Sequence, residues 1–158
     1  MKKVLFICLG NICRSPTAEG VFQSYVEREG LQKEIGIDSA GTSGHHVGDL
    51  ADPRMRKHAQ KRGYELTSRS RQFDPRRDFE NFDYLVVMDE SNKRDILSLD
   101  THQDYENKVF MMTDFSKQTT YNYVPDPYYG GAEGFEKVLD IVEDASEGLL
   151  EVIKKELS

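Results

Sequence analysis

A short apolar run that ends in a cysteine and a glycine-containing loop constrains this chain most. Val4–Ile7 predicts a buried strand, and the next eight residues, Cys8–Ser15, read Cys-Leu-Gly-Asn-Ile-Cys-Arg-Ser. Pro16 follows and suits the first turn of a helix. Because the free N–H groups of that helix would point back at the loop, this strand–loop–helix arrangement predicts an anion-binding site.

The same eight residues carry the groups that phosphoryl transfer needs. Cys8 would lie at the floor of the loop, where the positive end of the helix favours its thiolate. Arg14, six positions later, has a planar guanidinium that can bind two phosphate oxygens. A nucleophile beside an oxyanion cradle predicts attack of sulfur on phosphorus. The alternative is a buried structural cysteine beside a solvated arginine.

Three later segments extend the pattern, namely Asp38–Thr42, Met88–Asn92 and Val124–Gly130. Together with the first loop, and in this order, they resemble the low-molecular-weight protein tyrosine phosphatases over nearly the whole chain. The resemblance implies one α/β domain over residues 1–158, with a four-stranded parallel sheet flanked by helices in a flavodoxin-like, three-layer topology. It also implies a phosphomonoester hydrolase that needs neither a metal nor a cofactor.

The resemblance implies a reaction as well. Cys8 would take the phosphate from phosphotyrosine or a small aryl phosphate, and Arg14 would bind it. Asp126 would be the general acid that protonates the leaving oxygen and later activates water. Inorganic phosphate would be the product and an inhibitor. Pro125 and Pro127 restrict the backbone around Asp126, although a Pro-Asp-Pro segment alone also suits a solvated turn.

The phosphate-binding loop that the resemblance implies consists of Leu9, Gly10, Asn11, Ile12, Cys13 and Arg14. Asn11 can adopt a left-handed backbone conformation, with Ser39 as its supporting partner. Local sequence predicts that Ser15 is the helix N-cap, and the resemblance implies that its hydroxyl donates to the Cys8 thiolate. Cys13 is expected to form a reversible disulfide with Cys8, or to be a small buried side chain.

The substrate pocket is expected to contain Ile12, His45, Tyr128 and Tyr129. Either tyrosine could also be phosphorylated or simply pack at a turn. His45 stands where relatives often carry Trp or Tyr, and Ser68 stands where some carry a histidine that supports the loop. The first departure bears on substrate preference, and the second bears on the hydrogen-bond network that supports the loop.

Three other functions fit the sequence less well. An arsenate reductase would need downstream cysteines, and no cysteine follows Cys13. Phosphoarginine phosphatases place Thr at the position of Ile12, which offers an apolar wall to an aromatic ring. A non-catalytic phosphoprotein-binding module would need neither the Cys8 thiol nor the Asp126 carboxyl.

Apolar periodicity predicts the remaining elements. They are a helix from Ser15 to about Gly30, a weak strand at 35–37, a loop over 40–51, a helix over 52–63, a strand at 82–88, a helix over 90–98, a strand at 108–112 and a helix over 132–156. Gly148 lies inside the last helix and predicts a loose point there, since Gly costs about 1 kcal/mol relative to Ala.

The formal net charge of −7 argues against nucleic acid as a partner. It also gives no general attraction for a phosphorylated substrate, so attraction is expected only at Arg14 and the loop. The sequence shows no membrane-spanning stretch and no leader pattern, which favours a cytoplasmic protein. The four histidines show no metal-ligand spacing.

Overall fold

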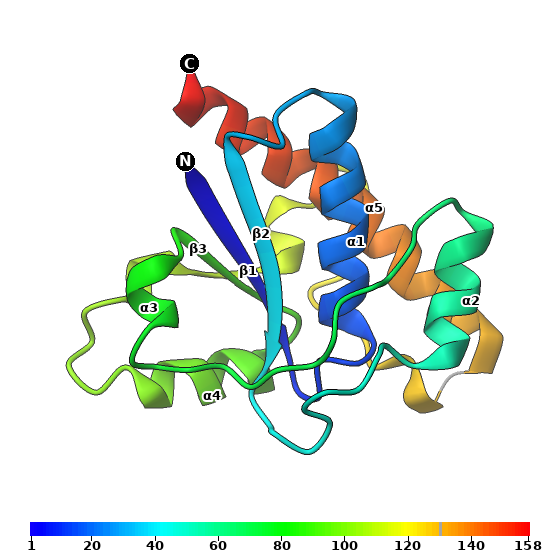
Figure 1. Ribbon diagram of the computed structural model, residues 1–158, viewed down its shortest axis with the longest axis horizontal. Helices are drawn as coiled ribbons and strands as arrows, with labels where there is room; N and C mark the ends of the chain where they lie inside the picture. The colour runs from blue at the N-terminus through cyan, green and yellow to red at the C-terminus, as the bar shows by residue number, and fades with distance from the viewer. Residues whose placement is uncertain (130) are drawn as a thin grey trace.

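Four parallel strands form the centre of the molecule (Figure 1). The computed structural model describes residues 1–129 and 131–158, the side chain of Tyr129 excepted. The strands are β1 (Lys2–Cys8), β2 (Ile35–Gly41), β3 (Tyr84–Val87) and β4 (Val109–Met111). Their spatial order is β2-β1-β3-β4. This is the flavodoxin-like order, in which ligands bind beyond the carboxyl ends of the strands where the order reverses.

Helices cover both faces of the sheet. They are α1 (Arg14–Arg28), α2 (Pro53–Lys61), α3 (Asp78–Asn81), α4 (Glu90–Leu99) and α5 (Gly131–Leu157), with the short 3-10 turns η1 (Glu106–Lys108), η2 (Met112–Phe115) and η3 (Pro127–Tyr129). Helices α1 and α5 pack on one face, whereas α3 and α4 pack on the other. The predicted three-layer fold is therefore confirmed.

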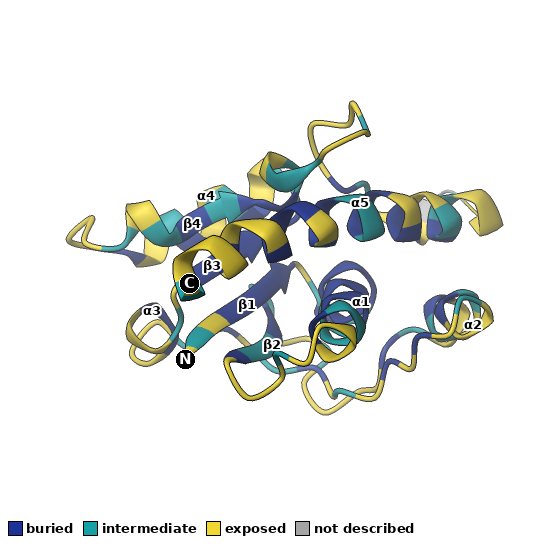
Figure 2. Cartoon of the chain, turned by 90° about the horizontal axis from the view of Figure 1, so that it is seen from above, coloured by how far each residue is buried: buried dark blue, intermediate teal, exposed yellow. Residues whose placement is uncertain are grey.

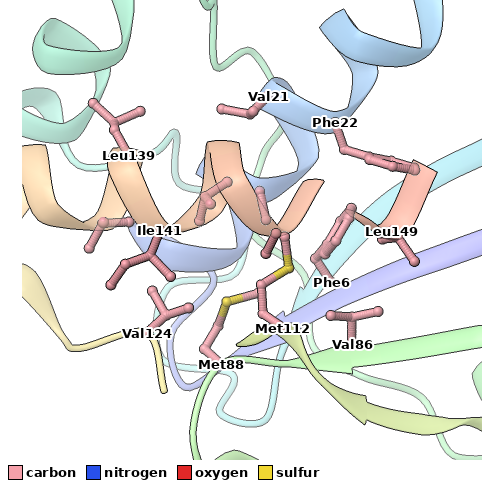
Figure 3. Packing of buried hydrophobic residues seen from close by; sticks show 14 of the residues in the cluster. Phe6, Val21, Phe22, Val86, Met88, Met112, Val124, Leu139, Ile141 and Leu149 are labelled. Carbon is pink, nitrogen blue, oxygen red and sulfur yellow. The ribbon is translucent and has the colours of Figure 1, made fainter. Parts of the chain in front are cut away.

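Alternate residues of β1 face the two helical layers. Val4 and Phe6 pack with α1 and α5, and Leu5 and Ile7 pack with α3 and α4. Phe22 of α1 meets Phe6 edge to face, with ring centroids 5.6 Å apart (Figure 3). All four strand residues are fully buried. Burial on both faces explains why the strand reads as a continuous apolar run instead of an alternating one.

Three strands differ in length from the sequence prediction, and β4 is one residue shorter at each end than the predicted 108–112. β2 runs on to Gly41, because it pairs with β1 from Lys2 opposite Ile35 to Cys8 opposite Gly41. This pairing includes polar residues that single-sequence periodicity does not recognise as strand. β3 is shorter than the predicted 82–88, and the four-residue helix α3 had no sequence signal.

The interior of α5 contradicts the expected loose point at Gly148. A Cβ added at this position would overlap the carbonyl oxygen of Phe115 in η2. Gly148 therefore permits a close approach of two backbones, and it is buried.

The helices are amphipathic, with buried inner faces and exposed outer faces (Figure 2). No helix in the described residues is both long and apolar enough to cross a membrane.

Candidate active site

The loop between β1 and α1 curls around the sulfur of Cys8. The Sγ atom lies 3.0 Å from Ser15 Oγ, and the backbone N–H of Asn11 donates to it at 3.3 Å. Cys8 is only 3% exposed. A backbone N–H and a hydroxyl group thus lie within hydrogen-bond distance of a nearly enclosed sulfur.

Asn11 connects this loop to β2. Its φ of 57° is the left-handed conformation expected from the sequence. Its Nδ2 donates to Ser15 Oγ at 2.8 Å and to Ser39 Oγ at 3.0 Å, while its Oδ1 accepts from the Arg71 N–H at 3.0 Å. Because the amide supplies a donor to Ser15 Oγ, the hydroxyl hydrogen of Ser15 is left for the Cys8 sulfur at 3.0 Å or the Ala40 carbonyl at 3.5 Å.

The predicted capping role of Ser15 is wrong. Helix α1 begins at Arg14 with Cys13 in the N-cap position, and no side chain caps it. Ser15 is fully buried and directs its hydroxyl into the loop. The contacts with Cys8 and Asn11 override the local preference of serine for an N-cap.

A buried carboxyl group lies behind Ser39. The Ser39 hydroxyl donates to Glu19 Oε1 at 2.5 Å. Burial raises the pKa of Glu19, and hydrogen bonds from Ser39 and Ser68 oppose that rise. Ser68 therefore lies next to the residues that support the loop.

Arg14 reaches from α1 towards the ends of two other chain segments. Its Nη1 donates to Asp89 Oδ2 at 2.6 Å and to the Val124 carbonyl at 3.0 Å. The residue is 4% exposed. Asp89 also caps α4 by accepting from the Asn92 N–H at 2.8 Å. The guanidinium is thus held in one orientation, as binding of phosphate oxygens requires.

Cys8, Arg14 and Asp126 line one pocket of about 340 Å³. Its lining residues are Cys8, Leu9, Gly10, Ile12, Cys13, Arg14, His46, Asp126 and Tyr128. The structure therefore brings the predicted nucleophile, arginine and carboxyl together, although Asp126 is more than 110 residues from Cys8 in the sequence.

His46 lines this pocket, whereas His45, which was predicted to do so, is not among its described lining residues. His45 lies in a turn in which its backbone N–H donates to Ser43 Oγ at 3.1 Å. Tyr128 is 60% exposed at the pocket. The side chain of Tyr129 lies outside the described residues.

Asp126 has a local turn contact at the pocket rim. Its Oδ1 accepts a hydrogen bond from the Tyr128 N–H at 3.0 Å. Asp126 comes immediately before η3, and Tyr128 lies within it. The Asp126 side chain is exposed, so it is accessible to a ligand. The turn and the acid interpretations are compatible, because one carboxyl oxygen accepts the turn hydrogen bond and the other is not used by it.

Cys13 is a buried free thiol in the same pocket. Burial, together with the charges of Asp52 and Cys8, raises its pKa to about 12. Cys13 therefore remains a neutral thiol at neutral pH and differs from a reactive thiolate.

Sequence reasoning assigned no role to Asp89, although it lies within the Met88–Asn92 segment, and it missed Glu19 and His46. Asp89 had a usable signal, because it closely follows a buried strand adjacent to β1, and carboxyl ends of parallel strands meet at the same edge. Glu19 and His46 had no such signal. Within the described residues, no group of three or more His, Cys, Asp or Glu could hold a metal ion.

Comparison with known proteins agrees with this geometry. The model of the family "Low molecular weight phosphotyrosine protein phosphatase" matches residues 3–158. A Synechocystis sp. relative, provisionally named a low molecular weight protein-tyrosine-phosphatase, is 49% identical over 155 residues, covering 98% of each chain. The low molecular weight phosphotyrosine protein phosphatase of Schizosaccharomyces pombe is 41% identical, covering 96% of each chain.

Solved structures give the same result. The crystal structure of a protein tyrosine phosphatase from Entamoeba histolytica, with Hepes in its active site, has a TM-score of 0.95 at 44% identity and covers 100% of each chain. YfkJ from Bacillus subtilis has a TM-score of 0.93 at 34% identity, covering 100% of this chain and 98% of that one. The chain therefore belongs to the low molecular weight phosphotyrosine protein phosphatases, a family of phosphomonoester hydrolases.

Proposed function

We propose that this enzyme hydrolyses phosphotyrosine in proteins, and small aryl phosphates, through a phosphate ester of Cys8. The observation that carries the proposal is the position of the Cys8 sulfur, which lies 3.0 Å from Ser15 Oγ and 3.3 Å from the Asn11 nitrogen in a pocket that also contains Arg14 and Asp126. A sulfur nucleophile, an anion cradle and a proton donor are the three groups that this reaction requires.

In the first step the Cys8 thiolate attacks phosphorus and the phenolic oxygen leaves. Within the described residues, Arg14 uses only Nη1 for protein contacts, so Nε and Nη2 remain for two phosphate oxygens. Backbone N–H groups of residues 9–14 bind the other oxygens as charge develops on them. Asp126 protonates the leaving oxygen.

In the second step Asp126 removes a proton from water, which attacks phosphorus and releases inorganic phosphate. The Cys8 sulfur is now the leaving group, and the Ser15 hydroxyl stabilises its negative charge. Because inorganic phosphate fits the same cradle, it acts as an inhibitor as well as a product.

An aromatic substrate suits the walls of the pocket. Ile12 and Tyr128 both line it, and both offer apolar surface to a tyrosine ring. No polar side chain stands at position 12 to recognise a guanidinium, which disfavours phosphoarginine. Binding alone would use neither the Cys8 thiol nor the Asp126 carboxyl, which disfavours a non-catalytic module.

Cys13 is proposed as the redox partner of Cys8. Peroxide would oxidise the Cys8 thiolate to a sulfenic acid, and attack by the Cys13 sulfur would release water and form the disulfide. Cys8 and Cys13 are too close in sequence to link distant parts of the fold, which favours a reducing compartment such as the cytoplasm.

The Cys8→Ser substitution tests the proposed nucleophile. We expect it to abolish hydrolysis of an aryl phosphate and to leave the fold, measured by circular dichroism, unchanged. Rapid quenching of the unmodified enzyme with labelled substrate should leave phosphate on Cys8. Phosphate on another residue, or substantial turnover by the variant, would contradict the mechanism. Cys13→Ser is the matched control and should remain active.

A further inference from the structure

Helix α2 concentrates positive charge in a chain whose net charge is −7. Five of the ten residues at 53–62 are Arg or Lys, and none is Asp or Glu. The chain is therefore not uniformly negative. A local potential of this kind can attract an anionic ligand despite the opposite net charge of the molecule.

Carboxylates of α5 neutralise part of the positive charge at 53–62 and leave other basic side chains without a partner. Arg62 forms ion pairs with Glu136, Asp140 and Glu143 of α5, at 2.6–2.9 Å. Within the described part of the chain, the side chains of Lys57 and Lys61 have neither an ion pair nor a hydrogen bond, and both residues are exposed. Their charges therefore face solvent without a protein partner.

Arg54 continues this surface to the pocket. It lies three positions before Lys57 and seven before Lys61, a spacing that places the three side chains on one face of the helix. Its guanidinium lies 5.7 Å from the ring centroid of Tyr128, a lining residue of the pocket. We call the surface formed by Arg54, Lys57 and Lys61 the basic stripe.

The N-terminal end of α2 is tied directly to the phosphate-binding loop. The Asp52 N–H donates to the Ile12 carbonyl at 2.8 Å, and the Asp52 carboxylate caps α2 through the Arg54 N–H at 2.8 Å. Asp52 also pairs with the Arg54 side chain at 3.0 Å, so Arg54 is partly neutralised. The uncompensated part of the stripe is therefore Lys57 and Lys61, which lie farther from the pocket.

We propose that the basic stripe binds acidic side chains that flank the phosphotyrosine of the substrate, so that the enzyme prefers acidic phosphopeptides. This inference rests on the proposed tyrosine phosphatase function. At about 1.5 Å per helical residue, Arg54 and Lys61 lie roughly 10 Å apart along α2. An extended peptide covers that length with about three residues. The acidic residues therefore lie within about five positions of the phosphotyrosine.

The narrowness of the stripe favours a peptide over a broader anion. On the side of α2 that faces α5, Glu136, Asp140 and Glu143 bring negative charge next to it. Figure 2 shows α2 at one edge of the molecule, with exposed residues on its outer side. A membrane or a nucleic acid would have to approach these carboxylates as well, whereas an extended chain can follow the stripe alone.

The test uses two phosphotyrosine peptides that differ only in their flanks. One carries Asp and Glu within five positions on both sides, and the other carries Asn and Gln instead. kcat/KM is measured for both peptides and for a small aryl phosphate, with the unmodified enzyme and with Lys57→Gln/Lys61→Gln. The control is Lys33→Gln/Lys155→Gln, which removes two exposed lysines before β2 and at the end of α5. It produces the same change in net charge.

We expect the unmodified enzyme to prefer the acidic peptide roughly three- to tenfold, as two exposed ion pairs would give. The preference should fall with added salt, approach unity in Lys57→Gln/Lys61→Gln and persist in the control. The small aryl phosphate, which does not reach the stripe, should be hydrolysed equally by all three proteins.

Equal kcat/KM for the two peptides, or a preference that persists in Lys57→Gln/Lys61→Gln, would overturn the proposal. A third outcome would also overturn it: the unmodified enzyme binds vesicles of anionic lipid, Lys57→Gln/Lys61→Gln does not, and neither peptide is preferred. Failure of every protein to hydrolyse the small aryl phosphate would instead contradict the proposed function. Binding of the two fluorescent peptides to the Cys8→Ser protein then still measures the preference, because it needs no turnover.

Discussion

The amide of Asn11 sets the direction of the hydrogen bonds around the nucleophile. Its two N–H donors reach Ser15 and Ser39, so each hydroxyl can direct its own hydrogen elsewhere. Ser39 donates to Glu19, and the Ser15 hydroxyl hydrogen is left for the Cys8 sulfur at 3.0 Å or the Ala40 carbonyl at 3.5 Å. An aspartate at position 11 would lack these donors. The left-handed backbone and the amide chemistry together explain why Asn suits this position.

Asp126 is the residue whose proposed role can be tested by the chemistry of the substrate. A general acid matters more when the leaving oxygen is more basic. Tyrosine leaves as a phenol with a pKa of about 10, whereas an electron-poor phenol needs less help. Asp126→Asn should therefore reduce kcat/KM for phosphotyrosine by roughly 10²- to 10⁴-fold and reduce it much less for an activated aryl phosphate.

The measurement is the dependence of kcat/KM on leaving-group pKa for both proteins. A steeper dependence in Asp126→Asn supports the proton-donor role. Parallel dependences would leave Asp126 as a turn residue that accepts the Tyr128 N–H. Asp49→Asn is a suitable control, because Asp49 is an exposed carboxylate that pairs with His46 of the pocket.

Individual residues were predictable from the sequence where local chemistry alone determines them. The left-handed Asn11 and the capping Asp52 follow from such local preferences. The position of the Ser15 hydroxyl could not be predicted from local preferences, because the tertiary fold brings its hydrogen-bond partners near. The same holds at the pocket, where His46 is a lining residue and the expected His45 is not among them, because the path of an exposed loop decides which of two adjacent histidines lies there.

Among the elements, burial decided which could be predicted. β3, and β1 from Val4 onward, consist of apolar residues that are buried on both faces, so both strands can be recognised as apolar runs in the sequence. β2 contains Gly36, Asp38 and Ser39, and it forms an edge of the sheet. Its strand conformation comes from pairing with β1, which no window of its own sequence contains.

The contact between α5 and η2 gives a prediction at the same scale. In an unconstrained helix Gly→Ala stabilises by about 1 kcal/mol. Gly148→Ala should instead destabilise the protein by roughly 1–3 kcal/mol, because its Cβ would overlap the Phe115 carbonyl and force the two segments apart. Urea unfolding measures the difference in free energy.

Gly20→Ala provides the control for this prediction. A Cβ at position 20 of α1 would meet the Cδ2 methyl of Leu66, the end of a flexible side chain. That methyl can move more easily than a carbonyl held in η2, so the loss should be smaller. An unchanged or higher stability of Gly148→Ala would show that the backbones of α5 and η2 leave room for a Cβ at position 148.

Across the whole molecule, opposite charges gather on different elements. The net charge of −7 was expected to leave attraction only to Arg14 and the loop. The sum conceals a basic α2 beside an acidic stretch of α5, and only the fold shows which of these charges neutralise each other. Total charge was therefore a poor guide to the surface around the pocket.

The response of the molecule to acid depends on carboxylates that its backbone holds in the charged form. Asp144 of α5 is partly buried, which alone would raise its pKa, but the N–H groups of Thr119, Gln118 and Lys117 lower it overall. A carboxyl whose pKa is lower in the folded state stabilises that state above its unfolded pKa, about 3.9 for Asp. This stabilisation is lost as the pH falls through the folded pKa.

Asp144→Asn should therefore reduce the free energy of unfolding at pH 7 by roughly 1–3 kcal/mol, because the amide accepts these bonds less strongly. The difference from the unmodified protein should shrink as the pH falls below about 3.9, since Asp144 is then increasingly protonated. Urea unfolding between pH 3 and pH 7 measures both effects. Glu147→Gln, which removes an exposed partner of Lys117 on the same helix, should change stability by less than about 1 kcal/mol. A loss in Asp144→Asn that does not depend on pH would show that the carboxylate charge is not what attaches residues 117–119 to α5.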